Sequence, residues 1–307
     1  MRIVYMGTPD FAVPPLEALV NAGHQVCGVF SQPDKPVGRH QNKLQPTPVK
    51  VCAQAHGIPV FQPDTLRDGA ALAQLEELAP ELIVVAAYGR VLPKKILDLP
   101  PKGCINVHSS LLPKYRGAAP INWAMVNGDA ETGVTIMHMA QALDAGDIID
   151  QAATPIDPEE TAEALHDRLA GLGGQLLVKV VADIAAGAAK RVPQDPEQVT
   201  YAPMLSRALC PIDWTQSAQA IHNKVRGLVP WPATSTDVIS GDTVKLFRST
   251  VLEQTVSAHP GVIVAAGKEG IDIACGDGKV LRILELQAPG SRRMAAADYL
   301  RGHPISV

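Results

Sequence analysis

Short apolar runs alternate with amphipathic stretches along the first half of the chain. Runs of this length are typical of buried strands, and apolar residues three and four positions apart indicate helices that cover a sheet. Strands are predicted at residues 2–6, 25–30, 59–61, 82–88, 103–108, 134–139 and 148–153, with helices at 16–21, 72–78 and 121–126 and another that ends near Gly57. Because strands that alternate with helices form parallel sheets covered on both faces, this half predicts a doubly wound, Rossmann-like α/β domain with a mostly parallel sheet.

The pattern changes after residue 160. Residues 160–186 predict one long amphipathic helix, interrupted by Gly171, Gly173 and Gly174, and a polar, proline-containing stretch that follows predicts a linker. Next come a helix at 215–227 and short β-like runs at 243–247, 261–265, 271–274 and 280–286, as in a small barrel or sandwich. We therefore expect a first domain at 1–188, a linker at 189–206 and a small β domain at 207–307.

Composition excludes several classes of protein. The 307 residues are 46% hydrophobic and 19% charged, which is enough apolar surface for a packed core. There is no apolar run of membrane-spanning length and no signal-peptide core, so we expect a cytoplasmic protein. The five cysteines are scattered without a C-x-x-C pair, so we expect reduced thiols and no metal cluster. A net charge of −4 argues against a chain coated with basic residues for nonspecific nucleic-acid binding.

The turn after the first predicted strand argues against an ordinary NAD enzyme. It reads Gly7-Thr8-Pro9-Asp10, with one glycine where a dinucleotide fold has G-x-G-x-x-G, and Pro9 removes an amide donor. The chain also has no G-x-S-x-G and no H-E-x-x-H motif, so two common hydrolase mechanisms lack support. Any chemistry must come from other residues.

The most informative segment follows the predicted strand at 103–108. Residues two apart on a strand point to the same face, so Asn106 and His108 project together at the carboxyl end, where open α/β sheets bind their ligands. Asn offers an amide donor to an oxyanion, and His exchanges a proton near neutral pH. An isolated Asn-x-His pair is more often structural, but hydroxyls, exposed amides and Arg116-Gly117 follow here.

A second group of polar residues, Leu143-Asp144-Ala145-Gly146-Asp147, lies between two predicted strands. It is either an Asx turn with two solvated carboxylates or the source of a carboxylate that holds the tautomer of His108. The spacing alone does not choose between Asp144 and Asp147.

Together these residues resemble a known family. Asn106-x-His108, the run SLLPKYRGAAPIN at 110–122 and LDAGD at 143–147 resemble the formyltransferases that use 10-formyltetrahydrofolate. MGTPDFA near the start, AYGRVLP at 87–93, NGDAETGVTIMHM at 127–139 and the IDW…RGLVPWP stretch at 212–232 are similar to the branch that formylates methionine on tRNA. The resemblance covers nearly the whole chain, including the C-terminal domain.

The resemblance implies roles for individual residues. Asn106, His108 and Asp144 would be the catalytic trio. The folate would lie against the segment 110–113 and against the segment 87–92 on the pterin side. The folate-binding residues implied are Ser110, Leu111, Leu112, Pro113, Tyr88, Gly89 and Leu92. No metal is expected, because no ligand cluster is evident and an activated formyl amide does not require one.

The same family uses a long loop of the first domain to reach the acceptor stem, and an OB-like barrel to grip the tRNA. In this chain the loop spans residues 35–50, carries Lys35, Arg39, Lys43 and Lys50, and has no acidic residue. We call residues 35–50 the arm. A cationic arm of this kind suits tRNA phosphates, although a solvated proline-rich loop is the alternative.

The resulting hypothesis is transfer of the formyl group of 10-formyltetrahydrofolate to the α-amino group of methionine on initiator tRNA, by a monomer. A sugar-amine formyltransferase and a 10-formyltetrahydrofolate hydrolase would use the same trio. A binding module without catalysis is a further alternative, which the intact trio disfavours. The arm argues for tRNA because a sugar nucleotide has no use for it.

Overall fold

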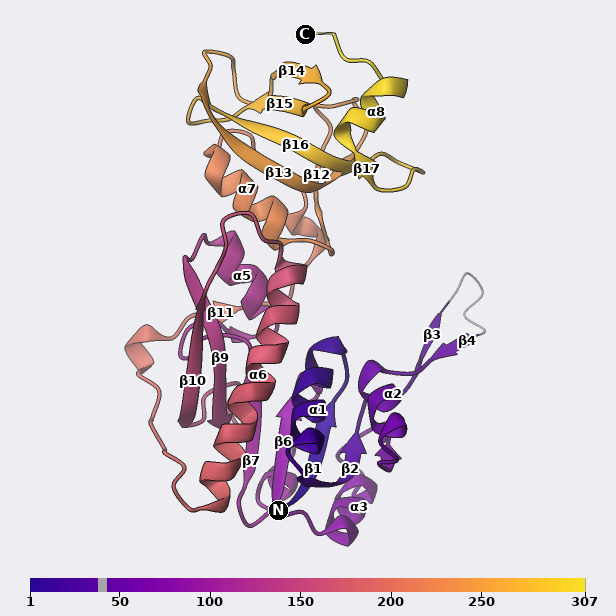
Figure 1. The fold of residues 1–307 in the computed structure, drawn as a ribbon, viewed down its shortest axis with the longest axis vertical. Helices are drawn as coiled ribbons and strands as arrows, with labels where there is room; N and C mark the ends of the chain where they lie inside the picture. Colours follow the sequence, from indigo (N-terminus) through magenta and orange to yellow (C-terminus); the bar gives the residue numbers. More distant parts are fainter. Residues whose placement is uncertain (38–42, 307) are drawn as a thin grey trace. The chain divides into compact units, whose positions relative to one another are not determined.

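The computed structural model describes residues 1–37 and 43–306. They form two compact units that interleave along the sequence (Figure 1). The first unit contains Met1–Gly117, Gly133–Thr154 and His166–Tyr201, and the second contains Ala118–Thr132, Pro155–Leu165 and the C-terminal part from Ala202. Each unit has its own sheet.

A seven-stranded sheet forms the first unit, in the order β10-β9-β7-β6-β1-β2-β5. Its strands are β1 (Arg2–Gly7), β2 (Gln25–Phe30), β5 (Val60–Phe61), β6 (Leu82–Ala86), β7 (Cys104–His108), β9 (Glu131–His138) and β10 (Ile148–Pro155). The strands from β7 to β5 are parallel, as predicted, whereas β9 runs antiparallel to β7. The parallel strands therefore end at one edge of the sheet, and β1, β6 and β7 are neighbours there.

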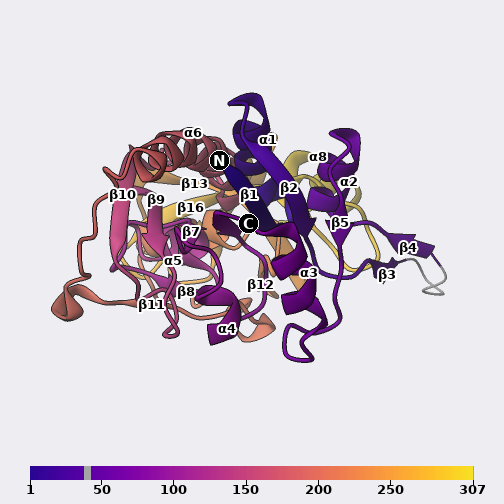
Figure 2. The ribbon, with the colours of Figure 1, turned by 90° about the horizontal axis from the view of Figure 1, so that it is seen from below.

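Helices cover both faces of this sheet, as Figure 2 shows. One face carries α1 (Val13–Asn21), α2 (Pro48–Ala55) and α6 (Ala162–Ala185), and the other carries α3 (Ala70–Leu78) and α4 (Lys94–Leu97). Pro14 and Pro15 stand in the first turn of α1, where a missing N–H costs little. The buried strands β1 and β6 supply the core between the two helical layers.

The predicted interruption of the long helix is wrong, since α6 is unbroken. A Cβ on Gly173 would lie 3.0 Å from a methyl group of Val107, and one on Gly174 would lie 3.1 Å from the carbonyl oxygen of Pro14. The glycines therefore let α6 approach the sheet and α1 closely. This close approach offsets the low helix propensity of glycine.

The predicted loop at 35–50 is also partly regular. It contains the antiparallel pair β3 (Lys35–Val37) and β4 (Lys43–Gln45), which Figures 1 and 2 show projecting from the helices around them. Thr47 ends this segment as the N-cap of α2, accepting a hydrogen bond from the amide of Lys50. Lys50 is therefore a helical residue rather than part of a loop.

The second unit is built on an antiparallel sheet, the small C-terminal β domain that the sequence predicts. Its elements are α5 (Pro120–Val126), α7 (Ala218–Gly227), β12 (Thr234–Thr236), β13 (Val244–Thr255), β14 (Ile263–Gly267), β15 (Gly270–Ala274), β16 (Lys279–Gln287), β17 (Met294–Ala295) and α8 (Ala296–Gly302). Strand β13 is much longer than the predicted run at 243–247. Its register against β16 shifts after Leu246 and after Arg248, and such bulges hide the alternation of apolar and polar residues.

The short strands β8 (Arg116–Gly117) and β11 (Tyr201–Ala202) form a further pair.

Among the described residues, no helix has the length and apolar character that crossing a membrane requires.

Candidate active site

Strand β7 carries Asn106 and His108 to the carboxyl edge of the parallel part of the sheet. Asn106 is half-buried and His108 is buried. Both belong to β7, two positions apart, so their side chains share one face of the strand. The neighbouring strands β1 and β6 end at Gly7 and Ala86 on the same edge, which is where ligands bind in open α/β sheets.

The His108 ring has a hydrogen-bond partner at one nitrogen and faces a carboxylate at the other. Its Nε2 lies 2.9 Å from the carbonyl oxygen of Tyr115, and its Nδ1 lies 3.8 Å from Oδ2 of Asp144. Because a carbonyl oxygen only accepts, Nε2 carries a proton in this arrangement. Nδ1 is then the nitrogen that can take up a second proton, and it faces a carboxylate that would stabilise the imidazolium.

The structure distinguishes the two aspartates of the LDAGD segment. Asp144 turns its carboxylate toward His108, and its Oδ2 also accepts a hydrogen bond of 2.9 Å from the amide of Gly117. Asp147 instead lies 3.4 Å from a guanidinium nitrogen of Arg191. Asp144 is therefore the carboxylate at the histidine.

The side chains expected to bind folate are mostly packed inward. Ser110 is fully buried, and its hydroxyl donates to the carbonyl oxygen of Lys114 at 2.6 Å. The amide of Leu112 donates to the hydroxyl of Thr135, and its carbonyl oxygen accepts from the amide of Gln151. Among residues 110–113, Leu111 and Pro113 keep partly exposed side chains.

On the expected pterin side, Tyr88 and Leu92 are buried, whereas Gly89 and Val91 are exposed. Tyr88 and Leu92 both belong to the apolar core between β6 and α4. The carbonyl oxygen of Tyr88 accepts from the Thr8 hydroxyl at 3.1 Å and from the Gln32 amide at 3.2 Å. A Cβ on Gly89 would meet nothing within 4 Å, and in the described chain no backbone hydrogen bond pairs residues 89–92 with another segment. The exposed residues Gly89 and Val91 therefore present backbone groups that can contact a ligand.

The structure places the four cations of the arm differently. Lys35 is exposed on β3, and Lys43 begins β4. Arg39 lies outside the described residues. Lys50 sits in α2, where its Nζ lies 2.6 Å from Oδ2 of Asp34 and donates to Oε1 of Gln62 at 2.8 Å.

Lys50 is thus part of a small polar network at the base of the arm. Gln62 also donates to Oδ1 of Asp34 at 2.7 Å. Hydrogen bonds from the Gln62 amide and the Lys50 ammonium lower the pKa of Asp34 below its ordinary value. The sequence does not reveal this pairing, because Asp34 stands one residue before the segment defined as the arm.

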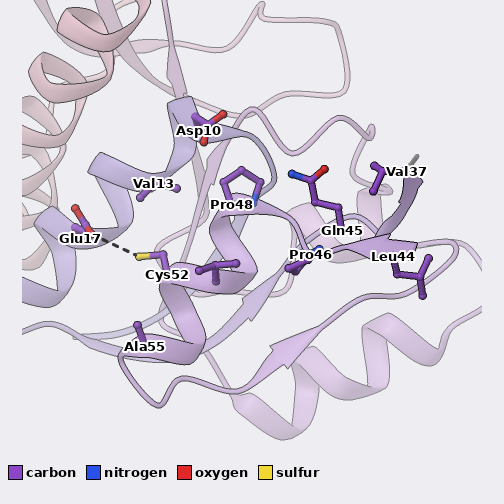
Figure 3. Close-up of a pocket in the computed structure, with 11 residues that line it drawn as sticks. Asp10, Val13, Glu17, Val37, Leu44, Gln45, Pro46, Pro48, Cys52 and Ala55 are labelled. Atoms are coloured by element: carbon purple, nitrogen blue, oxygen red, sulfur yellow. Dashed lines mark hydrogen bonds between the residues drawn. The ribbon is translucent and has the colours of Figure 1, made fainter. Parts of the chain in front are cut away.

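A cavity of about 830 Å³ lies beside the arm (Figure 3). It is lined by residues of α1, the β3–β4 pair and α2, and Cys52 in its wall points toward Glu17 across it. Within the described residues, Glu17, Cys52 and His56 bring three potential metal-binding atoms to within 4.8 Å of one another. Burial, together with the Glu17 carboxylate, raises the pKa of the Cys52 thiol to about 11, so a protonated thiol occupies this position at neutral pH.

Several polar residues that hold the site together carry no signal in the sequence. Thr135 and Gln151 bind the segment at 110–112, and Thr200 Oγ1 accepts from the amide of Tyr115 at 2.9 Å. Gln194 contacts the loops on both sides of His108. No local motif marks these residues, because their contacts span long separations in the chain.

Comparison with known proteins shows the family of this chain. Residues 1–181 match the family model described as formyl transferase, and residues 204–304 match the model for the formyl transferase C-terminal domain. The chain belongs to the formyl transferase family. It matches methionyl-tRNA formyltransferases over nearly the whole length of both proteins.

Two of these relatives illustrate the likeness. The methionyl-tRNA formyltransferase of Alkaliphilus oremlandii is 51% identical over 305 residues, which cover 99% of this chain and 97% of the relative. That of Trichlorobacter lovleyi is 48% identical, covering 100% of this chain and 95% of the relative. The crystal structure of an N-formyltransferase from Helicobacter canadensis, in complex with folinic acid and dTDP-3-aminofucose, shares the fold with a TM-score of 0.71. It is 21% identical, with 92% of this chain and 98% of that chain covered.

Proposed function

We propose that this enzyme transfers the formyl group of 10-formyltetrahydrofolate to the α-amino group of methionine on initiator Met-tRNA. The observation that carries the proposal is the near-full-length identity of about half with methionyl-tRNA formyltransferases, which extends through the C-terminal domain. The product, formyl-Met-tRNA, serves translation initiation. The enzyme would act as a monomer in the cytoplasm, without a catalytic metal.

The first part of the reaction is the attack of an amine on the formyl group, which forms an oxyanion. The free amine of methionine, whose ordinary pKa is about 7.7–8, attacks the formyl carbon. The Asn106 amide donates to the oxyanion that forms, which is the kind of preorganised contact that lowers such a barrier most. The C–N bond to the folate then breaks as the tetrahedral intermediate collapses.

His108 would accept and then donate a proton during this step. The attacking amine loses a proton and the departing folate nitrogen gains one, so a single base that later acts as an acid balances the reaction. Nδ1 would accept and return this proton, because Nε2 already donates a hydrogen bond to the carbonyl oxygen of Tyr115. Asp144, 3.8 Å from Nδ1, would stabilise the imidazolium formed between the two proton transfers.

The folate would bind between the two segments predicted for it. The exposed residues Gly89 and Val91 would offer backbone groups to the hydrogen-bonding edge of a pterin, since these groups have no backbone partner within the described chain, and Gly89 leaves room for the ring. Ser110, Leu111, Leu112 and Pro113 would form the opposite wall. Their fixed main-chain contacts through Thr135 and Gln151 support this role as a rigid surface.

The tRNA would be held through the arm and the C-terminal domain. Lys35, Arg39 and Lys43 are the cations we assign to phosphate contacts. Lys50 would support the base of the arm rather than contact a phosphate, because its ammonium group pairs with Asp34 and donates a hydrogen bond to Gln62.

One experiment separates the proposal from its alternatives. The protein is incubated with 10-formyltetrahydrofolate and either Met-tRNA, a nucleotide-linked amino sugar or buffer alone. Formylation of Met-tRNA supports the proposal. Formylation of the sugar, or release of formate in buffer at an equal rate, would identify the enzyme as a sugar-amine formyltransferase or a hydrolase instead.

A further inference from the structure

Two loops meet at His108, and both have unusual backbones. The first contains Tyr115, whose carbonyl oxygen accepts from the ring, and Tyr115 has a φ of 63°. The second contains Asp144, with a φ of 48°. Non-glycine residues in this left-handed region cost about 1 kcal/mol or more, so the surrounding structure must hold them there.

The second loop is also tightly confined beyond Asp144. A Cβ on Gly146 would lie 1.7 Å from the carbonyl oxygen of His138, so only glycine fits this close approach. The carbonyl groups of Asp144 and Gly146 point to the same neighbour, the side-chain amide of Gln194. This glutamine belongs to the stretch at 189–206 that the sequence predicts to be a linker.

Gln194 uses both ends of its amide. Its Nε2 donates to the carbonyl oxygen of Asp144 at 2.7 Å and to that of Gly146 at 2.9 Å. Its Oε1 accepts from Arg116 twice, from Nε at 3.0 Å and from a terminal nitrogen at 2.7 Å. Arg116 follows Tyr115 directly, so one side chain joins the loop of Tyr115 to the loop of Asp144.

The chemistry of the neighbours explains why an amide stands here. A guanidinium only donates hydrogen bonds, and main-chain carbonyls only accept them. A side chain between them must therefore accept on one side and donate on the other. A carboxylate could satisfy Arg116 but would face the two carbonyls without a proton, and an apolar side chain would satisfy neither.

We propose that Gln194 is a positioning residue for formyl transfer: it clamps the Arg116 and Asp144 loops together and so fixes the carboxylate of Asp144 against His108. It touches no reacting atom and acts through Asp144. This inference rests on the proposed function for its reaction, but the contacts that carry it are independent of the identity of the acceptor.

The test uses Gln194→Met and Gln194→Glu, with Gln198→Met and Gln198→Glu as matched controls. Gln198 lies in the same stretch, is exposed, and its amide contacts only the nearby Asp195 among the described residues. We expect both Gln194 variants to lower kcat by about 10- to 100-fold, since a displacement of about 1 Å in a catalytic group has effects of that size. KM for folate and tRNA should stay within about twofold, and both Gln198 variants should behave as wild type.

Two further measurements separate positioning from general destabilisation. In a His108→Ala background, Gln194→Met should have little additional effect on kcat, because residues that act as a unit are non-additive. The NMR signal of the His108 ring N–H should shift or broaden in Gln194→Met and stay unchanged in Gln198→Met. Near-normal kcat in Gln194→Met, an additive double variant or an unshifted ring signal would each overturn the proposal.

The NMR readout also keeps this proposal distinct from the proposed function. If wild-type protein does not formylate Met-tRNA, the proposed function fails. The positioning role of Gln194 is then still tested by the NMR signal of the His108 ring and by turnover with the acceptor that the enzyme does use.

Discussion

The catalytic edge of the sheet and the arm are built in opposite ways. At the edge, His108 is buried and held by Tyr115 and Asp144, which are themselves fixed by hydrogen bonds from distant parts of the chain. In the arm, Lys35 is exposed on a short strand pair. Proton transfer depends on tenths of an ångström, whereas attraction to a phosphate depends mainly on charge and approximate position.

Lys50 illustrates this contrast between fixed and exposed polar groups. By sequence it belongs with the cations of the arm, but in the structure it behaves like a residue of the catalytic edge, with fixed partners in Asp34 and Gln62. Charge alone therefore does not identify a phosphate contact. The partners of the charge decide whether it is free to bind a ligand.

The largest effect should come from the catalytic edge. His108→Ala and Asn106→Ala should each lower kcat by about 100-fold or more, the usual cost of losing a proton-transfer group or an oxyanion donor. Steady-state kinetics with Met-tRNA measures this, and circular dichroism checks that the fold is retained. Turnover close to that of wild type in either variant would remove that residue from the mechanism.

A smaller effect should separate the two aspartates. Asp144→Asn removes the charge that faces His108 but keeps an oxygen for the amide of Gly117, and we expect kcat to fall by about 10-fold or more. Asp147→Asn is the control, because Asp147 pairs with the exposed Arg191 and should change kcat less than about twofold. The reverse order of effects would move the role of the carboxylate to Asp147.

The arm should respond through binding and salt rather than through kcat. Arg39→Ala/Lys43→Ala should raise KM for Met-tRNA several-fold and make its dependence on salt shallower by about 1.5 in log–log slope, the value for two phosphate contacts. KM for 10-formyltetrahydrofolate should not change. Lys50→Ala is the matched variant, and its slope should equal that of wild type because Asp34 already neutralises this charge. Equal slopes in all three proteins would refute the phosphate contacts.

The smallest effect should be on stability in acid. The pKa of Asp34 is lowered in the folded state, so its carboxylate contributes to the free energy of unfolding. This contribution is complete above the ordinary pKa of 3.8 and is lost as the pH falls through the lowered pKa. Wild type should therefore exceed Asp34→Asn in unfolding free energy by less than about 1 kcal/mol near neutrality. Urea unfolding should show this difference shrinking below about pH 4. A difference independent of pH would mean that the Asp34 carboxylate is not held by this network.

Most of the first unit's sheet, and the place of Asn106 and His108 in it, can be read from local sequence patterns. Alternating apolar runs mark β1, β2, β6 and β7 because buried parallel strands need apolar residues on both faces. The spacing of Asn106 and His108 placed both on one face at the carboxyl end of β7, since strand geometry repeats every two residues. These are local properties, and local sequence is sufficient to specify them.

Which polar groups meet depends instead on the tertiary structure. It placed Asp144 rather than Asp147 beside His108, paired Lys50 with Asp34, and brought Gln194 between two loops about 50 and 78 residues away. It also left α6 unbroken, because its glycines fit against Val107 and Pro14. Such contacts join residues far apart in the chain, and a hydrogen bond or a close approach depends on three-dimensional positions that no local pattern of residues encodes.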